Sequence, residues 1–443
     1  MKKYVFLLLL NIPLWLQSSN VAYLVATGRC VLLNRYSVDK FLFNMSFFVF
    51  SLACFFVISP HWKKRCLQVA IFSSSLAICC FAIYWIFPQN RTLSNTIAYY
   101  QPNLKVSYTF SDAPFYKRSY PTAIVGENSQ VNFATDPRGF RNKQALEKAD
   151  IVVIGDSFTE GVFVDDDHIW PALLAQKTQQ KIYNLGISGA HPTHYYENLK
   201  RFGIPLKPKI VICMLYELND FKKMRNYEPQ KITHKILYFV RGLKMKILSS
   251  LLLDPLLGGI GSKSSFPQEE IFSWMPVTIN TNQHYFFPIQ EYRYALFSKD
   301  VFIQTPGWKQ VSHQLVKIQD LCKKHHIQLL YVLAPSKVRT TFPIVQSQYN
   351  EKSLLKMLAL QFPKLAINLE KIQKNFDNIE ETLGLFLKEK GGSFYSLTKD
   401  LRRETSKSGQ LYFTYDVHWN SLGHSVVSDA IFKKIRPLLE DNK

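Results

Sequence analysis

Residues 149–161 have the sequence ADIVVIGDSFTEG, and this stretch decides the fold class. Its first six residues form a short apolar run rich in β-branched side chains, which is typical of a buried parallel strand. The Gly-Asp-Ser that follows predicts a tight turn from strand to helix, with the hydroxyl of Ser157 projecting where a helix amino end favours developing negative charge. Alone the motif is ambiguous, because the same residues also occur as an ordinary helix cap.

Three further runs share this strand pattern, at residues 181–185, 209–215 and 327–333. Helix-like stretches alternate with them, at about 168–180, 193–203, 308–326, 350–362 and 425–439. Strands alternating with helices predict an α/β fold, in which helices cover both faces of a flavodoxin-like parallel sheet. In such sheets functional side chains follow the carboxyl ends of the strands, so we look for the chemistry there.

Two loops after predicted strands carry candidate oxyanion donors. One holds Gly186 and Gly189, and a glycine lets its backbone N–H approach a ligand closely. The other has the sequence Glu217-Leu-Asn219-Asp220, in which the Asn219 amide can donate to the same oxyanion. Taken singly, an ordinary glycine turn and a helix cap are the better explanations of these two loops.

A candidate base lies near the carboxyl terminus, in the sequence DVHWNSLGH at residues 416–424. His418 can accept the proton of Ser157, with Asp416 orienting the imidazole and stabilising its charged form. A lone His-Trp pair would more often be structural, so the interpretation depends on the other motifs.

Together the motifs GFR, IVVIGDSFTEG, YNLGISG, ELND and DVHWNSLGH resemble the SGNH (GDSL-type) hydrolase superfamily, and in particular its bacterial membrane-associated branch. The resemblance covers about 136–220 and 327–439. It implies an SGNH fold with Ser157 as nucleophile and Asp416 and His418 completing the triad. The oxyanion hole would then comprise the N–H groups of Ser157 and Gly189 and the side chain of Asn219, with Gly186 as second choice.

The sequence departs from the superfamily pattern at two points. Glu217 replaces the glycine of the usual Gly-x-Asn-Asp motif, and Asp416 and His418 are spaced Asp-x-His rather than Asp-x-x-His. The shorter spacing followed by Trp is similar to alginate O-acetyltransferase relatives. We expect a serine esterase acting on ester-linked acyl groups of an envelope glycan or lipid. An envelope O-acyltransferase and a catalytically inactive envelope scaffold stay open as alternatives. The resemblance implies no cofactor and no metal.

Residues 1–90 contain three long apolar stretches, at about 4–27, 41–59 and 67–87. Each approaches the roughly 20 residues that a helix needs to cross a bilayer. The first also fits a signal peptide, but it lacks a clear cleavage site and two further spans follow, so we expect an uncleaved helix.

Positive charge in the short loops indicates the orientation of these spans. Five Lys and Arg residues (Lys2, Lys3, Lys63, Lys64, Arg65) would share one side, and three (Arg29, Arg35, Lys40) the other. This favours a cytoplasmic amino terminus. We therefore predict a multi-pass protein of the inner (plasma) membrane with an extracytoplasmic catalytic domain. Residues 1–90 would be three transmembrane helices, 91–148 a linker and accessory lead-in, and 149–443 the catalytic domain.

The net charge of +21 indicates an anionic partner, such as a membrane surface or an acidic glycan. No nucleic-acid recognition module occurs, so nucleic acid is not an expected partner. The expected partners are an acylated glycan or lipid substrate, the membrane and, for the transferase alternative, a membrane acyl-donor protein. Cys213 and Cys322 are expected to be buried free thiols.

An insertion at about 221–307 interrupts the catalytic domain. At about 222–253 it has the pattern of a basic amphipathic helix, suited to a lid, a membrane contact or docking on the domain. The pairs His191/His194 and His325/His326 lack the partners of a metal site, and we expect them to be structural or solvated. Lys337 follows a predicted strand end and is a candidate contact for an acidic substrate.

Overall fold

A computed structural model describes part of the chain, namely residues 91–93, 97–111, 127–222, 275–279, 282–286, 298–355, 369–414 and 416–440. All of these belong to one compact unit, formed by Arg91–Glu228 and Phe266–Lys443. The three predicted membrane spans and all but the first residue of the predicted basic helix lie outside the described residues. Within the described residues, no helix combines the length and apolar character needed to cross a bilayer.

The centre of the unit is a five-stranded parallel sheet with the order β11-β10-β7-β5-β6. Its strands are β5 (Ile151–Ile154), β6 (Ile182–Asn184), β7 (Ile210–Tyr216), β10 (Gln328–Ala334) and β11 (Ser393–Ser396). Counted along the chain this is the 2-1-3-4-5 order of flavodoxin-like folds. The predicted parallel α/β sheet is therefore confirmed. Only β11 had no counterpart among the predicted strands.

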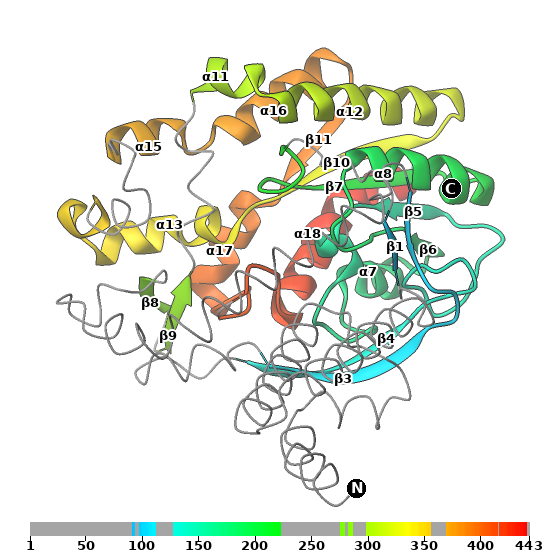
Figure 1. Cartoon of the computed structure of the whole chain (residues 1–443), viewed down its shortest axis with the longest axis horizontal. Helices are drawn as coiled ribbons and strands as arrows, with labels where there is room; N and C mark the ends of the chain where they lie inside the picture. The colour runs from blue at the N-terminus through cyan, green and yellow to red at the C-terminus, as the bar shows by residue number, and fades with distance from the viewer. Residues whose placement is uncertain are drawn as a thin grey trace, which may run out of the picture. The chain divides into compact units, whose positions relative to one another are not determined.

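Helices cover both faces of this sheet (Figure 1). α7 (Trp170–Thr178) leads from β5 to β6, and α8 (Pro192–Asn198) returns the chain past β5 to β7. Because such crossovers are right-handed, the reversal of direction at β6 places α7 and α8 on opposite faces. α12 (Pro306–Lys324) and α16 (Asn378–Glu389) continue in the direction of α8, and α18 (Ser421–Glu440) packs against α7.

The core is densest along β7, where all seven residues are buried. Burying a Val, Leu or Ile side chain contributes about 1.5–3 kcal/mol, so this central strand anchors the unit. Cys213 on β7 and Cys322 on α12 are buried free thiols, which confirms the expectation for both. Further helices of this unit include α11 (Lys299–Gln304), α13 (Lys337–Gln348), α15 (Leu369–Asn375) and α17 (Thr398–Ser408).

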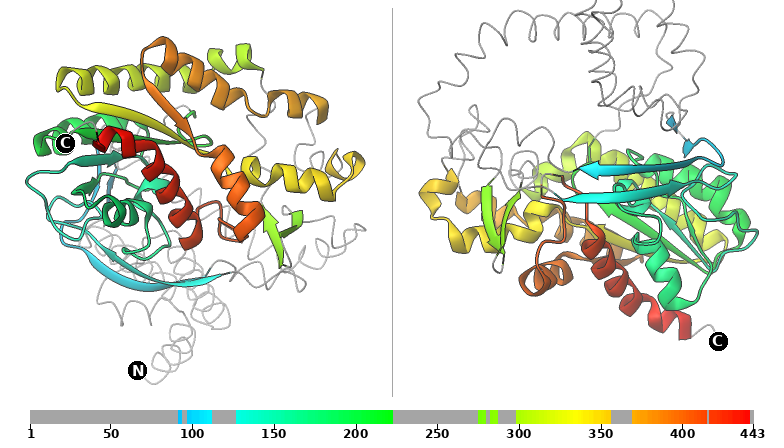
Figure 2. Two further views of the ribbon diagram at one scale, coloured as in Figure 1. Left: turned by 180° about the vertical axis from the view of Figure 1, so that it is seen from behind. Right: turned by 90° about the horizontal axis from the view of Figure 1, so that it is seen from below.

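Residues ahead of the first parallel strand form small antiparallel pairs. β1 (Arg91–Leu93) pairs with β2 (Ala98–Tyr100), and β3 (Lys105–Ser111) pairs with β4 (Asn128–Ala134). Figure 2 shows β3 and β4 as a two-stranded ribbon separate from the five-stranded sheet. β8 (Met275–Ile279) and β9 (Asn282–Phe286) form a further pair within the insertion. The described part of the lead-in thus contains two antiparallel strand pairs.

Arg141, the arginine of the GFR motif, ties this lead-in to the loop after the nucleophile motif. Its side chain is 1% exposed and forms an ion pair with Asp166 at 2.6 Å. The guanidinium also donates to main-chain carbonyls of Asn132, Glu160, Gly161 and Val164. One side chain therefore satisfies several buried acceptors at once, as the five N–H donors of arginine allow.

Replacing Arg141 by Met is expected to destabilise the unit by about 3–5 kcal/mol, because it leaves Asp166 and buried carbonyls without their donor. Urea unfolding of the full chain, followed by tryptophan fluorescence, measures the change. Arg403→Met on α17 is the matched control, since that arginine is exposed and should matter little. Equal unfolding midpoints for the two variants would contradict the role given to Arg141.

Candidate active site

Ser157 is the first residue of α6 (Ser157–Glu160), directly after the turn that ends β5. Asp156 caps this helix, its carboxylate accepting the N–H of Phe158 at 3.0 Å. Ser157 is 6% exposed. The motif therefore serves both as a helix cap and as a nucleophile turn. Asp156 caps the helix, and the side chain of Ser157 points into the site.

The structure brings Ser157, His418 and Asp416 together in one hydrogen-bonded chain. Ser157 Oγ lies 2.7 Å from His418 Nε2, and His418 Nδ1 lies 2.5 Å from Asp416 Oδ1. The carboxylate fixes the tautomer, so Nδ1 carries the proton and Nε2 accepts from the serine. Asp416 Oδ1 also accepts the backbone N–H of His418 at 2.8 Å. Because of the short Asp-x-His spacing, the Asp416 carboxylate contacts both the backbone and the ring of His418.

The charge of Asp416 sets the basicity of this pair. Burial lowers the pKa of His418, but the charge and hydrogen bond of Asp416, together with the charges of Asp156 and Glu160, outweigh it and raise the pKa above 6.5. Burial raises the pKa of Asp416, yet the His418 charge and hydrogen bonds prevail and lower it below 3.8. The imidazole is therefore a stronger base than a free histidine.

Aromatic rings lie beside the imidazole. The rings of Phe158 and His418 are 5.0 Å apart, and the Phe163 ring stands edge-on to His418 at 5.8 Å. Phe163 has a φ of +65°, an uncommon backbone conformation for a bulky residue, and Phe110 of β3 stacks on its ring at 4.0 Å. The lead-in thus contributes to the surroundings of His418, which no sequence motif indicated.

The two candidate glycines have different roles. Gly186 packs so closely that an added Cβ would lie 2.5 Å from Glu160 N, and its own N–H donates to Asn184 Oδ1 at 2.8 Å. Gly189 has a φ of +75°, and within the described part of the chain its N–H donates no hydrogen bond. The same holds for the N–H of Ser157. Gly189 rather than Gly186 is the glycine with a backbone donor to offer.

Asn219 is held next to the nucleophile turn. Its side-chain NH₂ donates to Asp156 Oδ2 at 2.7 Å, which leaves its second N–H for a ligand. Burial raises the pKa of Asp156, although the hydrogen bond from Asn219 opposes the shift. Asp220 is fully buried and accepts from Tyr195 OH and from the Tyr216 N–H, both at 2.8 Å. Asp220 therefore braces the loop after β7.

Glu160 is a functional neighbour that no motif singled out. Its carboxylate accepts the N–H of Ser188, next to Gly189, and the hydroxyl of Tyr100 at 2.9 Å. It is 2% exposed. One carboxylate therefore connects the nucleophile helix, the Gly189 loop and the lead-in, and it also adds to the raised pKa of His418. Only its position at the end of the GDSFTEG motif hinted at such a role.

Glu217, the departure from the glycine of the family pattern, points away from the triad. Its carboxylate accepts the N–H of Ser336 at 2.7 Å and the Nε of Arg339 at 2.5 Å. Arg339 continues to Asp377 at 2.6 Å. Although burial lowers it, the pKa of Arg339 is raised overall by these carboxylates. Glu217 thus joins the end of β7 to the start of α13 by a buried ion pair.

Lys337 is not available as a contact for an acidic substrate. It is fully buried, and its Nζ donates to the carbonyls of Phe413 at 2.6 Å and Thr414 at 2.7 Å. These carbonyls lie just ahead of Asp416, and the charge of Lys337 helps to lower the pKa of that carboxyl. Lys337 begins α13 directly after β10, and the residues just before Asp416 lie over this position. The side chain is therefore covered and cannot reach a substrate.

Of the two histidine pairs, His191 and His194 are buried and have a structural role, whereas His325 and His326 are exposed to solvent. His194 Nδ1 accepts the N–H of His191 at 2.9 Å, at the start of α8. Burial lowers the pKa of His191 to about 4, and its Nε2 lies 3.2 Å from the carbonyl of Lys222. His325 and His326 are exposed just beyond the end of α12. Among the described residues, no three His, Cys, Asp or Glu side chains are placed to share a metal ion.

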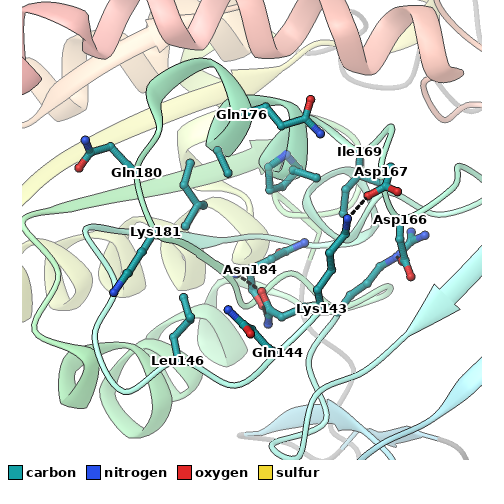
Figure 3. Close-up of a pocket in the computed structure, with 16 residues that line it drawn as sticks. Lys143, Gln144, Leu146, Asp166, Asp167, Ile169, Gln176, Gln180, Lys181 and Asn184 are labelled. Atoms are coloured by element: carbon teal, nitrogen blue, oxygen red, sulfur yellow. Dashed lines mark hydrogen bonds and ion pairs between the residues drawn. The ribbon is translucent and has the colours of Figure 1, made fainter.

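A separate hollow of about 310 Å³ opens beside α7 and β6, and the triad does not line it. Figure 3 shows mainly polar side chains around it, with Lys143 and Asp167 joined in an ion pair. The site around Ser157 is therefore distinct from this hollow.

No protein-family model and no curated protein matches this chain. Solved structures resemble it weakly. A GDSL-like lipase from Bacteroides thetaiotaomicron VPI-5482 is 11% identical, with 65% of this chain and 88% of that chain covered and a TM-score of 0.30. An acetyl xylan esterase is 14% identical, with 64% and 99% covered and a TM-score of 0.32. The esterase EstA from Pseudoalteromonas sp. is 11% identical, with 66% and 99% covered and a TM-score of 0.31. We base the function on the geometry of the site itself.

The imidazole of His418 is expected to titrate above pH 6.5, and Asp416→Asn should move that titration to lower pH, because it removes the charge that raises the pKa. Histidine NMR titration of the full chain measures both values. His191, whose pKa lies near 4 through burial, is the internal control and should be the same in both proteins. An unchanged His418 titration in the variant would contradict the pairing.

Proposed function

We propose that this chain is a serine esterase of SGNH type that acts on ester-linked acyl groups of an envelope glycan or lipid. The observation that carries the proposal is the Ser157–His418–Asp416 hydrogen-bonded chain at the carboxyl edge of a parallel sheet. A serine hydroxyl is a poor nucleophile until a base takes its proton, and this geometry supplies the base and its orienting acid.

The first half of the cycle forms an acyl-enzyme. As Ser157 Oγ attacks the acyl carbonyl, its proton passes to His418 Nε2 over the 2.7 Å hydrogen bond. Asp416 stabilises the resulting imidazolium without taking the proton itself. His418 then donates the proton to the leaving alcohol oxygen, which breaks the ester bond. The raised pKa of His418 favours the first transfer and keeps the imidazolium available for the second.

Three donors surround the position where the oxyanion would develop: the N–H of Ser157, the N–H of Gly189 and the second N–H of Asn219. Supporting this assignment, both backbone groups lack a partner within the described residues, and Asn219 is fixed by Asp156. Donors held in place before the reaction stabilise the transition state without reorganising, and one of them is typically worth about 10²–10³ in kcat.

The acyl acceptor distinguishes the esterase from the O-acyltransferase alternative. Water attacking the acyl-enzyme completes hydrolysis, whereas a sugar hydroxyl completes transfer to an envelope polysaccharide, with a membrane acyl-donor protein as partner. Both use the same triad, with His418 activating the second nucleophile. Mass analysis of products formed with and without an envelope glycan decides between them. No cofactor is part of either cycle.

The inactive-scaffold alternative depended on the two departures from the family pattern. In the structure the Asp-x-His spacing still permits a 2.5 Å contact between the carboxylate and the imidazole. The Glu217 side chain is engaged by Ser336 and Arg339 rather than filling the site. Neither departure therefore obstructs the proposed chemistry.

Ser157→Ala is expected to abolish both labelling by a fluorophosphonate probe and turnover of an activated acyl ester. His418→Ala should lower both strongly, because the hydroxyl loses its base. Gel fluorescence and ester hydrolysis by the full chain provide the measurements. Ser406→Ala, at an exposed serine of α17, is the matched control and should behave as wild type. Undiminished turnover by Ser157→Ala would end the proposal.

Asn219→Ala is expected to lower kcat by about 10²–10³ with a small change in KM, because the lost donor acts on charge that appears only in the transition state. Steady-state kinetics on one activated ester separate the two constants. A rise in KM at unchanged kcat would instead give Asn219 a role in ground-state binding.

A further inference from the structure

Exposed lysines precede every strand of the five-stranded sheet. Each lies within five residues of the strand start, and the positions are Lys148, Lys181, Lys207, Lys209, Lys323, Lys324, Lys388 and Lys390. Because the strands are parallel, all of their amino ends meet at one edge of the sheet. We call the surface formed by these eight lysines the strand-start edge. In Figure 1 the strand-start edge is the end of the unit where α12 ends and β10 begins.

The lysines form a broad row rather than a converging pocket. Five strands at about 4.8 Å spacing extend over roughly 20 Å. Of these eight lysines, only Lys390 has an ion pair within the described part of the chain, with Glu389 at 3.0 Å. Lys177, which also precedes β6, is left out of the set because it is paired with Asp429 at 2.7 Å. The opposite, carboxyl edge is acidic and buried, with Asp156, Glu160 and Asp220 around the site. The strand-start loops also contain Glu147, Asp150 and Glu389, but the lysines outnumber them, so the end away from Ser157 has a surplus of positive charge.

Helix dipoles account for only part of this row. Cations in the last turn of a helix are favoured there, and Lys323, Lys324 and Lys388 occupy such positions. Lys181 and Lys209 lie beyond the ends of the preceding helices, and Lys148 follows no helix. The dipole effect falls off within a turn, so these further lysines need another explanation.

We propose that the strand-start edge docks on an anionic bilayer surface. No arginine occurs in the five residues before any of these strands, so the cations are all lysines. A lysine is a flexible point charge, whereas the planar guanidinium of arginine binds a single phosphate or carboxylate in a bidentate manner. A row of such charges about 20 Å wide matches a plane of acidic headgroups, which attracts each nearby lysine additively. The attraction is screened by salt, because the lysines are exposed.

Docking in this way also limits which substrate can reach Ser157, an argument that rests on the proposed function. β7 is seven residues long, and at about 3.3 Å per residue it separates the two edges by roughly 20 Å. With the lysines on the headgroups, Ser157 lies at the far edge, away from the lipid. The substrate ester then belongs to a glycan beyond the headgroups rather than to a lipid of the docked bilayer.

Lysine footprinting on the full chain tests the docking. The chain is reconstituted in nanodiscs of phosphatidylcholine with or without phosphatidylglycerol, acetylated briefly and analysed by mass spectrometry. Acetylation of the eight lysines is expected to fall severalfold with phosphatidylglycerol and to recover at high salt. Lys309, Lys352, Lys374 and Lys399, exposed elsewhere, should not change. Equal acetylation of the eight in both discs overturns the proposal, as does protection only by soluble polygalacturonate, an acidic polysaccharide.

A pair of variants separates this proposal from the proposed function. Lys207, Lys209, Lys323 and Lys324 are changed together to Gln, and the control variant carries the same change at Lys309, Lys352, Lys374 and Lys399. Only the first should lose the protection of Lys148, Lys181, Lys388 and Lys390. Both should hydrolyse a soluble activated ester as wild type does. Retained protection in the first variant refutes docking, whereas a wild-type chain without esterase activity refutes the function and leaves docking unaffected.

Discussion

The carboxyl ends of β5, β6 and β7 are held side by side by main-chain hydrogen bonds, and that alignment brings Ser157, the Gly189 loop and Asn219 together. β5 delivers Ser157, β6 delivers the Gly189 loop, and β7 delivers Asn219. The three loops are close only because parallel strands end at one edge. A one-residue slip of β7 would reverse which of its side chains face each layer and would carry Asn219 away from Asp156.

Buried carboxylates then lock these loops to one another. Asp156 holds Asn219, Glu160 holds the loop beside Gly189, and Asp220 braces the turn after β7. Burying a carboxylate is costly unless it is hydrogen-bonded, and each of these is. The charges of Asp156 and Glu160 also add to that of Asp416 in raising the pKa of His418, so two of the carboxylates that hold the loops also strengthen the base. Positioning and basicity are therefore linked in this site.

The distribution of charge follows the direction of the strands. Acids and their partners gather at the carboxyl edge, whereas exposed lysines lie where the strands begin. A parallel sheet gives a domain two chemically different ends, since loops at one end carry the chemistry and loops at the other are free to vary. In this chain lysines outnumber acidic residues in the second set of loops, which suits the proposed attachment surface and leaves the reactive end open.

The sequence by itself determined the parallel α/β sheet, and it identified the serine, aspartate and histidine that the structure brings together. The strands and the site residues can both be recognised from short stretches of sequence, namely apolar runs that end in polar motifs. The sequence missed the short antiparallel strands outside the parallel sheet, including β4, which has a single fully buried residue, and it missed β11, which has only four residues. Only the tertiary structure showed that the N–H of Gly186 is hydrogen-bonded, whereas that of Gly189 has no partner among the described residues. It also showed that Glu160 and Arg141 tie the loops together, and that Lys337 is buried under the loop before Asp416. These features depend on contacts between residues far apart in the chain. Hydrogen bonds between such residues produce no periodic pattern in the sequence from which they could be predicted.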